Sequence, residues 1–372
     1  MVTFDAILRR HHGVGPGFDF LRIFLALSVV FWHSWQVSYP AATVSAIRSG
    51  PAGILVFCIV PAFFALSGFL VTGSLVRLKN LKLFLAFRAL RIAPALVTEI
   101  MLSALVLGPV VTALPLSDYF SDWQFYGYFT NLVGLMKYQL PGVFLENPLQ
   151  TVNGQLWTVP AELHCYALIS VLALLRIASR RSWMLAALLV LCFAETLYRF
   201  IPGRPVSVEA HNMVVLYFLS GSVIYLWRDR IPSRWPLALA GLAIFAVAVH
   251  APSPLRPLLA PIPISYATIY FGLKTLPKLP ILMGGDYSYG IYLYSFPIQQ
   301  AVTLAFPALR HWYFNFALAA PVAILFAMLS WHLLEKPILR LRKRLAPTAA
   351  IPRTVLDESA ADAPAVASSV GA

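Results

Sequence analysis

The stretch from Phe18 to Trp35 constrains the fold of this chain more than any other. It has close to the ~20 apolar residues that an α-helix needs to cross a bilayer, yet it carries Arg22 near its start and His33 near its end. Eleven helical residues turn through about 1100°, so these two side chains share one face, about 16 Å apart along the axis. Ionisable groups within a bilayer usually face a bundle interior or a wet cavity. The sequence therefore predicts a cavity beside this helix.

The composition extends this prediction to the whole chain. Of the 372 residues, 59% are hydrophobic and 12% are charged, whereas soluble domains carry about 25% charged residues. Runs of about 20 apolar residues predict an all-α membrane protein with about ten transmembrane helices. We place these helices at 18–38, 52–75, 84–113, 156–175, 183–200, 210–227, 235–250, 258–273, 287–306 and 313–334. The three cysteines lie inside these apolar runs without metal-ligand spacing, so we interpret them as buried apolar residues.

The basic residues predict the orientation of these spans. With the N-terminus in the cytoplasm, 22 of the 28 Lys and Arg residues fall on the cytoplasmic side, as the positive-inside rule expects. We therefore predict that both termini are cytoplasmic, and we attribute the net charge of +13 to topology rather than to nucleic-acid binding. The domain prediction is a cytoplasmic segment over 1–17, a membrane domain over 18–345 and a disordered cytoplasmic tail over 346–372. The last span ends W-H-L-L-E-K-P, which we interpret as an ordinary cytoplasmic terminus.

The longest connection, residues 114–153, is predicted on the outer side and is rich in aromatic residues. Connections of this length usually have a function or a structure of their own, and we expect an interfacial or re-entrant helix near 125–136. Its aromatic residues suit a membrane-interface belt. They would also suit stacking on sugar rings, and both interpretations stay open.

Two basic motifs carry the first candidates for chemistry. A neutral imidazole at His33 can act as a general base toward a hydroxyl, because its ordinary pKa lies near neutrality; the alternative is a histidine that only packs between helices. Arg88 and Arg91 are three residues apart, so they share one helical face and form a fork for phosphate oxygens. Ordinary positive-inside charge, or contact with lipid head groups, is the alternative for this pair.

Polar residues in three other spans are further candidates. Glu162 lies in an apolar stretch, where a carboxylate pairs with a cation or holds a proton, and the predicted topology lets it meet His33. Tyr292 and Ser295 extend a row of hydroxyls that begins at Tyr289 along one side of the ninth span; the alternative is interhelical hydrogen bonding. The pair Ser67-Gly68 in the second span permits close helix approach, with a narrow ligand tunnel as the alternative.

These motifs occur in an order that resembles the acyltransferase-3 family of integral membrane acyltransferases. The order is Arg22-x10-His33, then S-G-F-L, R-A-L-R, L-W-T-V-P-A-E-L-H-C-Y and S-Y-G-I-Y-L-Y-S-F-P-I, over roughly residues 15–340. The resemblance implies that His33 is the catalytic histidine and that Arg22 is coupled to it. It also implies that Arg88 and Arg91 handle acyl-CoA.

The resemblance also bears on the fourth and ninth spans. Trp157 and Glu162 match the family's fourth-span motif. The ninth-span motif commonly reads Y-L-x-H-x-P, and here Ser295 stands where that histidine would be. This departure puts a second-histidine role in doubt. We place Trp157, Tyr292 and Ser295 together as candidate substrate-binding residues.

The sequence thus predicts a multi-pass O-acyltransferase of the inner membrane that uses no metal. Acyl-CoA, with acetyl-CoA as the expected donor, binds from the cytoplasm at Arg88, Arg91 and Arg22. The acceptor is a hydroxyl of a cell-surface glycan or lipid-linked saccharide on the outer side, with membrane lipid as the surrounding partner. His33, oriented by Glu162, takes the proton of that hydroxyl, which attacks the thioester directly. The alternative is a proton-coupled transporter or flippase with Glu99 in the relay, but the inverted repeats of broken helices typical of transporters are not evident.

Overall fold

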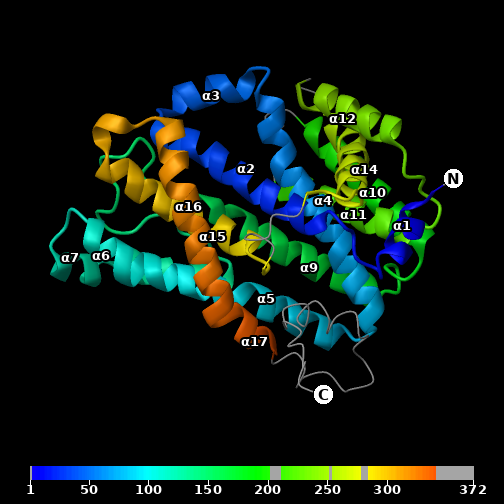
Figure 1. The fold of residues 1–372 in the computed structure, drawn as a ribbon, viewed down its shortest axis with the longest axis horizontal. Helices are drawn as coiled ribbons and strands as arrows, with labels where there is room; N and C mark the ends of the chain where they lie inside the picture. The colour runs from blue at the N-terminus through cyan, green and yellow to red at the C-terminus, as the bar shows by residue number, and fades with distance from the viewer. Residues whose placement is uncertain (1, 202–210, 251–253, 278–283, 341–372) are drawn as a thin grey trace, which may run out of the picture.

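The computed structural model describes residues 2–201, 211–250, 254–277 and 284–340, and over these ranges the chain is helical, with two isolated bridges outside the helices (Figure 1). The first half contains α1 (Phe4–Arg10), α2 (Phe18–Ser38), α3 (Ala41–Ser49), α4 (Gly53–Leu78), α5 (Leu81–Leu102), α6 (Gly108–Val111), α7 (Leu116–Ser121), α8 (Trp123–Tyr128) and α9 (Thr158–Leu174). The second half contains α10 (Arg181–Arg199), α11 (His211–Leu226), α12 (Trp235–His250), α13 (Arg256–Leu259), α14 (Pro261–Gly272), α15 (Ser288–Ala305), α16 (Trp312–Ser330) and α17 (Lys336–Arg340). The all-α prediction is confirmed.

Six helical segments of the described residues are long and apolar enough to cross a membrane. They are Phe18–Ser38, Gly53–Leu78, Leu81–Val111, Gly154–Leu174, Arg181–Arg199 and Trp312–Arg340. The chain is therefore a multi-pass membrane protein. Shorter helices, α11, α12, α14 and α15, occupy the positions of the other four predicted spans. The count of ten and the cytoplasmic termini stay predictions, and the predicted tail, 346–372, lies outside the described residues.

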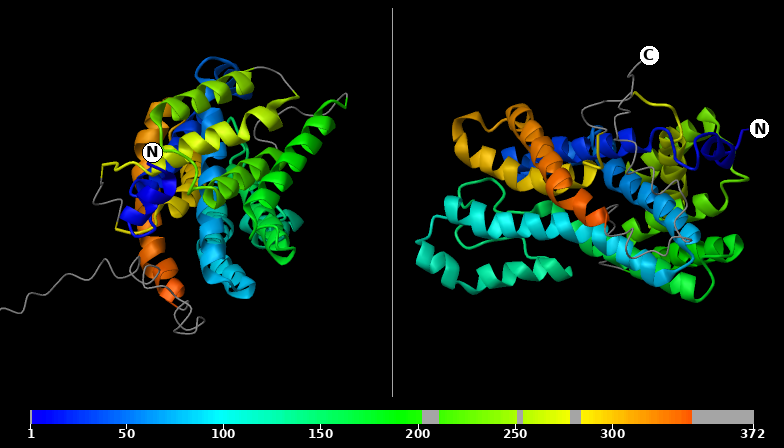
Figure 2. Two further views of the ribbon diagram at one scale, coloured as in Figure 1. Left: turned by 90° about the vertical axis from the view of Figure 1, so that its right-hand side faces the viewer. Right: turned by 60° about the horizontal axis from the view of Figure 1, so that its bottom comes forward.

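The helices form two packed groups, and α4 contacts members of both (Figure 2). In one group, α15 packs against both α2 and α16; in the other, α4 packs against α11 and α14. A Cβ on Gly68 would lie 1.8 Å from the backbone oxygen of Phe218, and one on Gly221 would lie 1.9 Å from that of Ala65. The two glycines therefore permit α4 and α11 to approach backbone to backbone, as the Ser67-Gly68 pair predicted.

Two irregular segments shape the outer part of the bundle. A π-helical turn, Ser103–Leu107, joins α5 to α6, just before the Gly108-Pro109 pair. The connection after α6 folds into α7, α8 and the 3-10 segment Phe129–Val133, close to the helix expected near 125–136. The connection is also tied to α15, because the Gln300 amide donates to the backbone oxygens of Leu149 and Thr151 at 2.6 Å.

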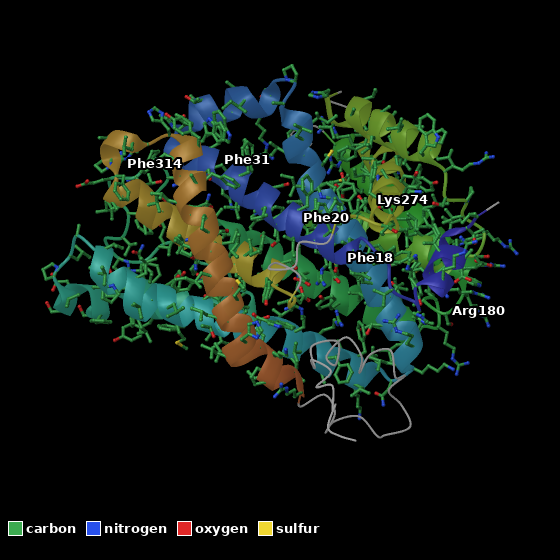
Figure 3. The ribbon with its side chains drawn as sticks, viewed as in Figure 1. Phe18, Phe20, Phe31, Arg180, Lys274 and Phe314 are labelled. Carbon is green, nitrogen blue, oxygen red and sulfur yellow. The ribbon has the colours of Figure 1, made fainter. Side chains whose placement is uncertain are left out.

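Four labelled side chains mark the two ends of the bundle (Figure 3). Arg180 and Lys274 lie toward the end that carries α1, whereas Phe31 and Phe314 lie toward the opposite end. The predicted orientation would place the start of α2 at the cytoplasmic end and the start of α9 at the outer end, and this orientation stays a prediction.

Candidate active site

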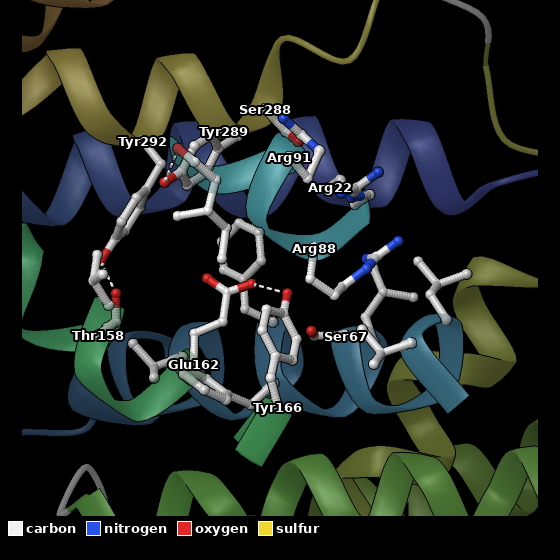
Figure 4. Close-up of a pocket in the computed structure, with 18 of the residues that line it drawn as sticks. Arg22, Ser67, Arg88, Arg91, Thr158, Glu162, Tyr166, Ser288, Tyr289 and Tyr292 are labelled. Carbon is white, nitrogen blue, oxygen red and sulfur yellow. Dashed lines mark hydrogen bonds between the residues drawn. The ribbon is translucent and has the colours of Figure 1, made fainter. Parts of the chain in front are cut away.

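A cavity lies between α2, α4, α5, α9 and α15 (Figure 4). Its apolar walls are Val29, Val60, Phe63, Phe64, Leu66, Leu70, Val71, Ile92 and Val159. Its polar lining consists of Arg22, Ser67, Arg88, Arg91, Thr158, Glu162, Tyr166, Ser288, Tyr289 and Tyr292. The three arginines lie toward one end of the cavity, and Thr158 and Tyr292 lie toward the other (Figure 4). The cavity predicted beside α2 is therefore present, with cations at the predicted cytoplasmic end.

The two arginines of α5 differ in their partners. Arg91 Nη2 lies 2.7 Å from Asp286 Oδ2, and its Nη1 lies 2.9 Å from Glu335 Oε2. Arg88 forms no ion pair with the described residues, and its Nε is buried without a hydrogen-bond partner. The Arg88 side chain interacts with the hydroxyl of Tyr166, which also lines the cavity. Arg88 is thus the member of the pair that is available to an anionic ligand, whereas Arg91 is held by carboxylates.

Asp286 joins the first and third spans. Arg22 Nη1 lies 3.1 Å from Asp286 Oδ2, the same oxygen that Arg91 contacts. Asp286 precedes α15, outside the membrane-spanning helices; burial raises its pKa, but Arg22 and Arg91 lower it further, to about 2. The carboxylate is therefore ionised at neutral pH and fixes two guanidinium groups of the cavity.

Glu335 extends this network to α15 and α16. Its carboxylate is buried and accepts a hydrogen bond from Ser330 at 3.0 Å, and the Tyr294 hydroxyl donates to Ser330 at 2.9 Å. The interpretation of W-H-L-L-E-K-P as an ordinary cytoplasmic terminus was therefore wrong. A charged residue inside an apolar helix was the available signal, because such a group needs a buried partner.

Glu162 lies inside the cavity, one helical turn from Tyr166. The Tyr166 hydroxyl donates to Glu162 Oε1, and Arg91 and Tyr289 lie near enough to interact electrostatically with the carboxylate. Glu162 forms no hydrogen bond with His33, so the expected orientation of the imidazole by this carboxylate is not seen in the structure. The carboxylate shares the cavity with the arginines instead.

His33 lies beyond the outer end of the cavity. Its side chain is buried, its ring packs edge-on against Phe296 with 4.9 Å between centroids, and its Nδ1 has no hydrogen-bond partner. Val29 and Tyr292 line the cavity, and His33 and Phe296 each follow them by four residues. One helical turn, about 5–6 Å, therefore separates the cavity lining from the imidazole on both helices.

The outer end of the cavity is closed by hydroxyl groups. The Tyr292 hydroxyl donates to the Gln155 backbone oxygen at 2.6 Å and also pairs with the Thr158 hydroxyl. Trp157, the last residue of the 3-10 segment Gly154–Trp157, packs half-buried against the core. Ser295 is fully buried and donates to the Tyr292 backbone oxygen at 3.3 Å rather than lining the cavity. Of the three predicted substrate-binding residues, the cavity thus includes Tyr292.

The structure adds three residues that the motifs did not single out: Asp286, Glu335 and Tyr166. Tyr166 follows Glu162 by four residues, so helical spacing alone was a signal for that contact. Asp286 precedes the ninth-span motif directly, but nothing in its neighbours indicated partners on α2 and α5. Among the described residues, no group of three or more His, Cys, Asp or Glu side chains is placed to hold a metal ion.

Comparisons with known proteins identify the family to which the chain is similar. The model of the acyltransferase-3 family, described as an acyltransferase domain, matches residues 16–335. The chain is similar to an O-acetyl transferase of Shigella phage Sf6, with 27% identity over 334 residues that cover 87% of this chain and 95% of that protein. It is also similar to Nodulation protein 10 of Rhizobium leguminosarum bv. viciae, with 26% identity over 371 residues that cover 88% and 94% of the two chains. No solved structure matches it at a significant level.

Proposed function

Because this chain belongs to the acyltransferase-3 family and is an O-acyltransferase, we propose that it transfers an acetyl group from cytoplasmic acetyl-CoA to a hydroxyl on the outer side of the inner membrane. The acceptor is a glycan or a lipid-linked saccharide. One observation carries the proposal: the cavity runs from the unpaired Arg88 along α2 to the turn that precedes His33. Such a path connects an anion-binding group with a proton acceptor. The family assignment also removes the basis for the transporter alternative.

Arg88 binds the phosphates of the donor in this proposal. Acetyl-CoA is strongly anionic at one end and slim at the other, which suits a cavity with arginines at one end and apolar walls beyond them. Guanidinium groups bind phosphate oxygens through charge-assisted hydrogen bonds. Arg91 and Arg22 contribute positive charge from fixed positions, since Asp286 holds both of them.

Glu162 and Tyr166 bind the middle of the donor. The arm of coenzyme A carries amide groups, whose N–H donors need acceptors once the arm has left water. The Glu162 carboxylate offers a free oxygen inside the cavity, since the Tyr166 hydroxyl bonds to Oε1. In this position Glu162 acts on donor binding rather than on the imidazole.

His33 acts as the general base. Its Nδ1 has no partner and lies one turn past the cavity lining, where a thioester carried along the cavity would arrive. His33 takes the proton from the acceptor hydroxyl as the oxygen attacks the thioester carbonyl carbon. The carbon–sulfur bond then breaks, the acetyl group stays on the acceptor oxygen, and the thiolate of coenzyme A takes up the proton. Both reactants are held together in this step, which itself lowers the barrier.

The outer end of the cavity receives the acceptor. Tyr292 and Trp157 flank this end, and the aromatic connection 114–153 lies on the same side of the bundle. The Tyr292 hydroxyl bonds to Gln155 and Thr158, so Tyr292 contributes its aromatic ring to this end, and Trp157 contributes an aromatic ring beside it that suits a sugar.

The proposal can be tested by supplying the two substrates on opposite sides of the membrane. Proteoliposomes of known protein orientation receive radiolabelled acetyl-CoA on one side only and an impermeant glycan acceptor on the other. The proposal expects labelled glycan only when the donor faces the end that carries α1. Transfer that requires both substrates on one side would contradict it.

A further inference from the structure

A second hollow opens between α5 and α9, which both belong to candidate membrane spans. Its volume of about 530 Å³ compares with about 150 Å³ for the cavity described above. It is lined by Leu85, Arg88, Ala89, Ile92, Ala93, Leu96, Val97, Leu132, Val159, Leu163, Tyr166, Ala167 and Ser170. Leu85 and Val97 on α5 and Leu163 on α9 are each about 40% exposed, so the hollow is open along its length.

Small side chains create this hollow. Ala89 and Ala93 on α5 and Ala167 on α9 are all exposed and line it. Where larger side chains would fill the space between two helices, these three leave a groove. Both walls belong to segments apolar enough to span the membrane, Leu81–Val111 and Gly154–Leu174.

The polar groups of the groove define what can occupy it. The Ser170 hydroxyl donates to the Tyr166 backbone oxygen at 2.7 Å, and the Tyr166 hydroxyl donates to Glu162, so both have partners. Arg88 also interacts with Tyr166, but its Nε is buried without a hydrogen-bond partner and no ion pair neutralises its charge among the described residues. An apolar groove with a single cation fits a ligand that has an apolar chain and one anionic group.

The length of the groove matches one leaflet. From Arg88 to Val97, nine residues of α5 rise about 14 Å, and one leaflet contributes about 15 Å of the hydrocarbon core. We propose that this groove binds an anionic phospholipid, with one acyl chain between α5 and α9 and its phosphate beside Arg88. The four residues Arg88, Ile92, Val159 and Tyr166 line both hollows, so the lipid lies directly against the wall of the donor cavity. Because the proposed function assigns Arg88 to the phosphates of the donor, the lipid phosphate and the donor would compete for this guanidinium group, and the inference rests on the proposed function in this respect.

Photolabelling tests the proposal on the full chain in vesicles. The probe is phosphatidylglycerol with a diazirine in its acyl chain, diluted into phosphatidylcholine, and adducts are mapped by peptide mass spectrometry. Adducts are expected to be several-fold more abundant on 85–97 and 163–170 than on α10. Adducts spread evenly over the lipid-facing helices would overturn the site.

Groove-filling variants sharpen the test. Ala93→Phe and, independently, Ala167→Phe should reduce the groove adducts several-fold and leave those on α10 unchanged, which also reports that the bundle is folded. Ala186→Phe is the matched control, since Ala186 is exposed on α10 and does not line the groove. Undiminished groove labelling in both filled variants contradicts the proposal. Equal labelling by a phosphatidylcholine probe overturns the anionic assignment, and labelling by a photoactivatable long-chain acyl-CoA alone assigns the groove to the donor instead.

Discussion

Arg22 on α2 and Arg91 on α5 contact the same carboxylate oxygen of Asp286, at 3.1 Å and 2.7 Å. This shared oxygen fixes the first and third spans relative to each other at the cationic end of the cavity. The two arginines of α5 therefore differ in role, because Arg91 forms ion pairs with carboxylates and Arg88 does not. The following predictions test that difference and its consequences.

Arg88→Ala should raise the KM for acetyl-CoA and leave the thermal unfolding midpoint near that of the wild type. A hydrogen bond to a charged group contributes about 1.5–3 kcal/mol, so the expected increase in KM is roughly 10- to 100-fold. Arg88→Lys should recover part of the loss, since it keeps the charge without the guanidinium fork. Steady-state kinetics over a range of donor concentrations measures this. An unchanged KM would remove Arg88 from the donor site.

The main effect of Arg91→Ala should be a loss of protein stability. The substitution leaves the buried Glu335 carboxylate without its cation, and breaking a buried ion pair costs about 3–5 kcal/mol. The unfolding midpoint in detergent should fall by several degrees. Glu335→Gln in the same chain should restore much of it, because the uncompensated charge is then gone. If the double variant is no more stable than Arg91→Ala, the ion pair does not explain the loss.

Acid should weaken the network through Asp286. Its folded-state pKa of about 2 lies below the ordinary value of 3.8, so the stability it contributes is present above about pH 4 and is lost as the pH falls toward 2. The difference corresponds to about 2 kcal/mol. Unfolding midpoints measured from pH 6 to pH 3 should fall less steeply for Asp286→Asn than for the wild type. If the unfolding midpoints of the two proteins fall equally steeply with pH, Asp286 does not contribute stability in this way.

Glu162→Gln separates two interpretations of this carboxylate. If Glu162 binds the donor, the variant raises the KM for acetyl-CoA and keeps the pH profile of kcat. If it orients His33, as the sequence predicted, kcat falls and its pH profile shifts. We expect the first result. Tyr166→Phe is the matched variant, because it removes the hydroxyl that bonds to Glu162. It should also raise the KM for acetyl-CoA.

The apolar runs of about 20 residues made much of the fold predictable. The span predicted over 18–38 coincides with α2, and helices occupy the positions of the other predicted spans. The site was harder to predict, because its contacts are distant in sequence. Arg91 and Glu335 are 244 residues apart, and Arg22 and Asp286 are 264 apart. A local motif shows which residues share a helical face, but it cannot show which helices face one another.

The same limit explains why the expected contact between Glu162 and His33 is absent from the structure. Both residues were placed at similar depth, and depth alone made a contact reasonable. The packing of α15 between the two residues prevents this contact, because Phe296 covers the imidazole and Tyr292 closes the cavity. Conversely, Tyr166 was overlooked although it follows Glu162 by one turn.

His33 carries the central claim, and one measurement tests it most directly. Proteoliposomes with equal amounts of wild-type, His33→Ala and His33→Gln protein receive radiolabelled acetyl-CoA and a glycan acceptor, and labelled product and bound donor are both measured. We predict that both variants bind donor as the wild type does and lose about 10²-fold or more of the transfer rate, as removal of a general base does. Transfer at the wild-type rate in either variant, at equal donor binding, would contradict the account.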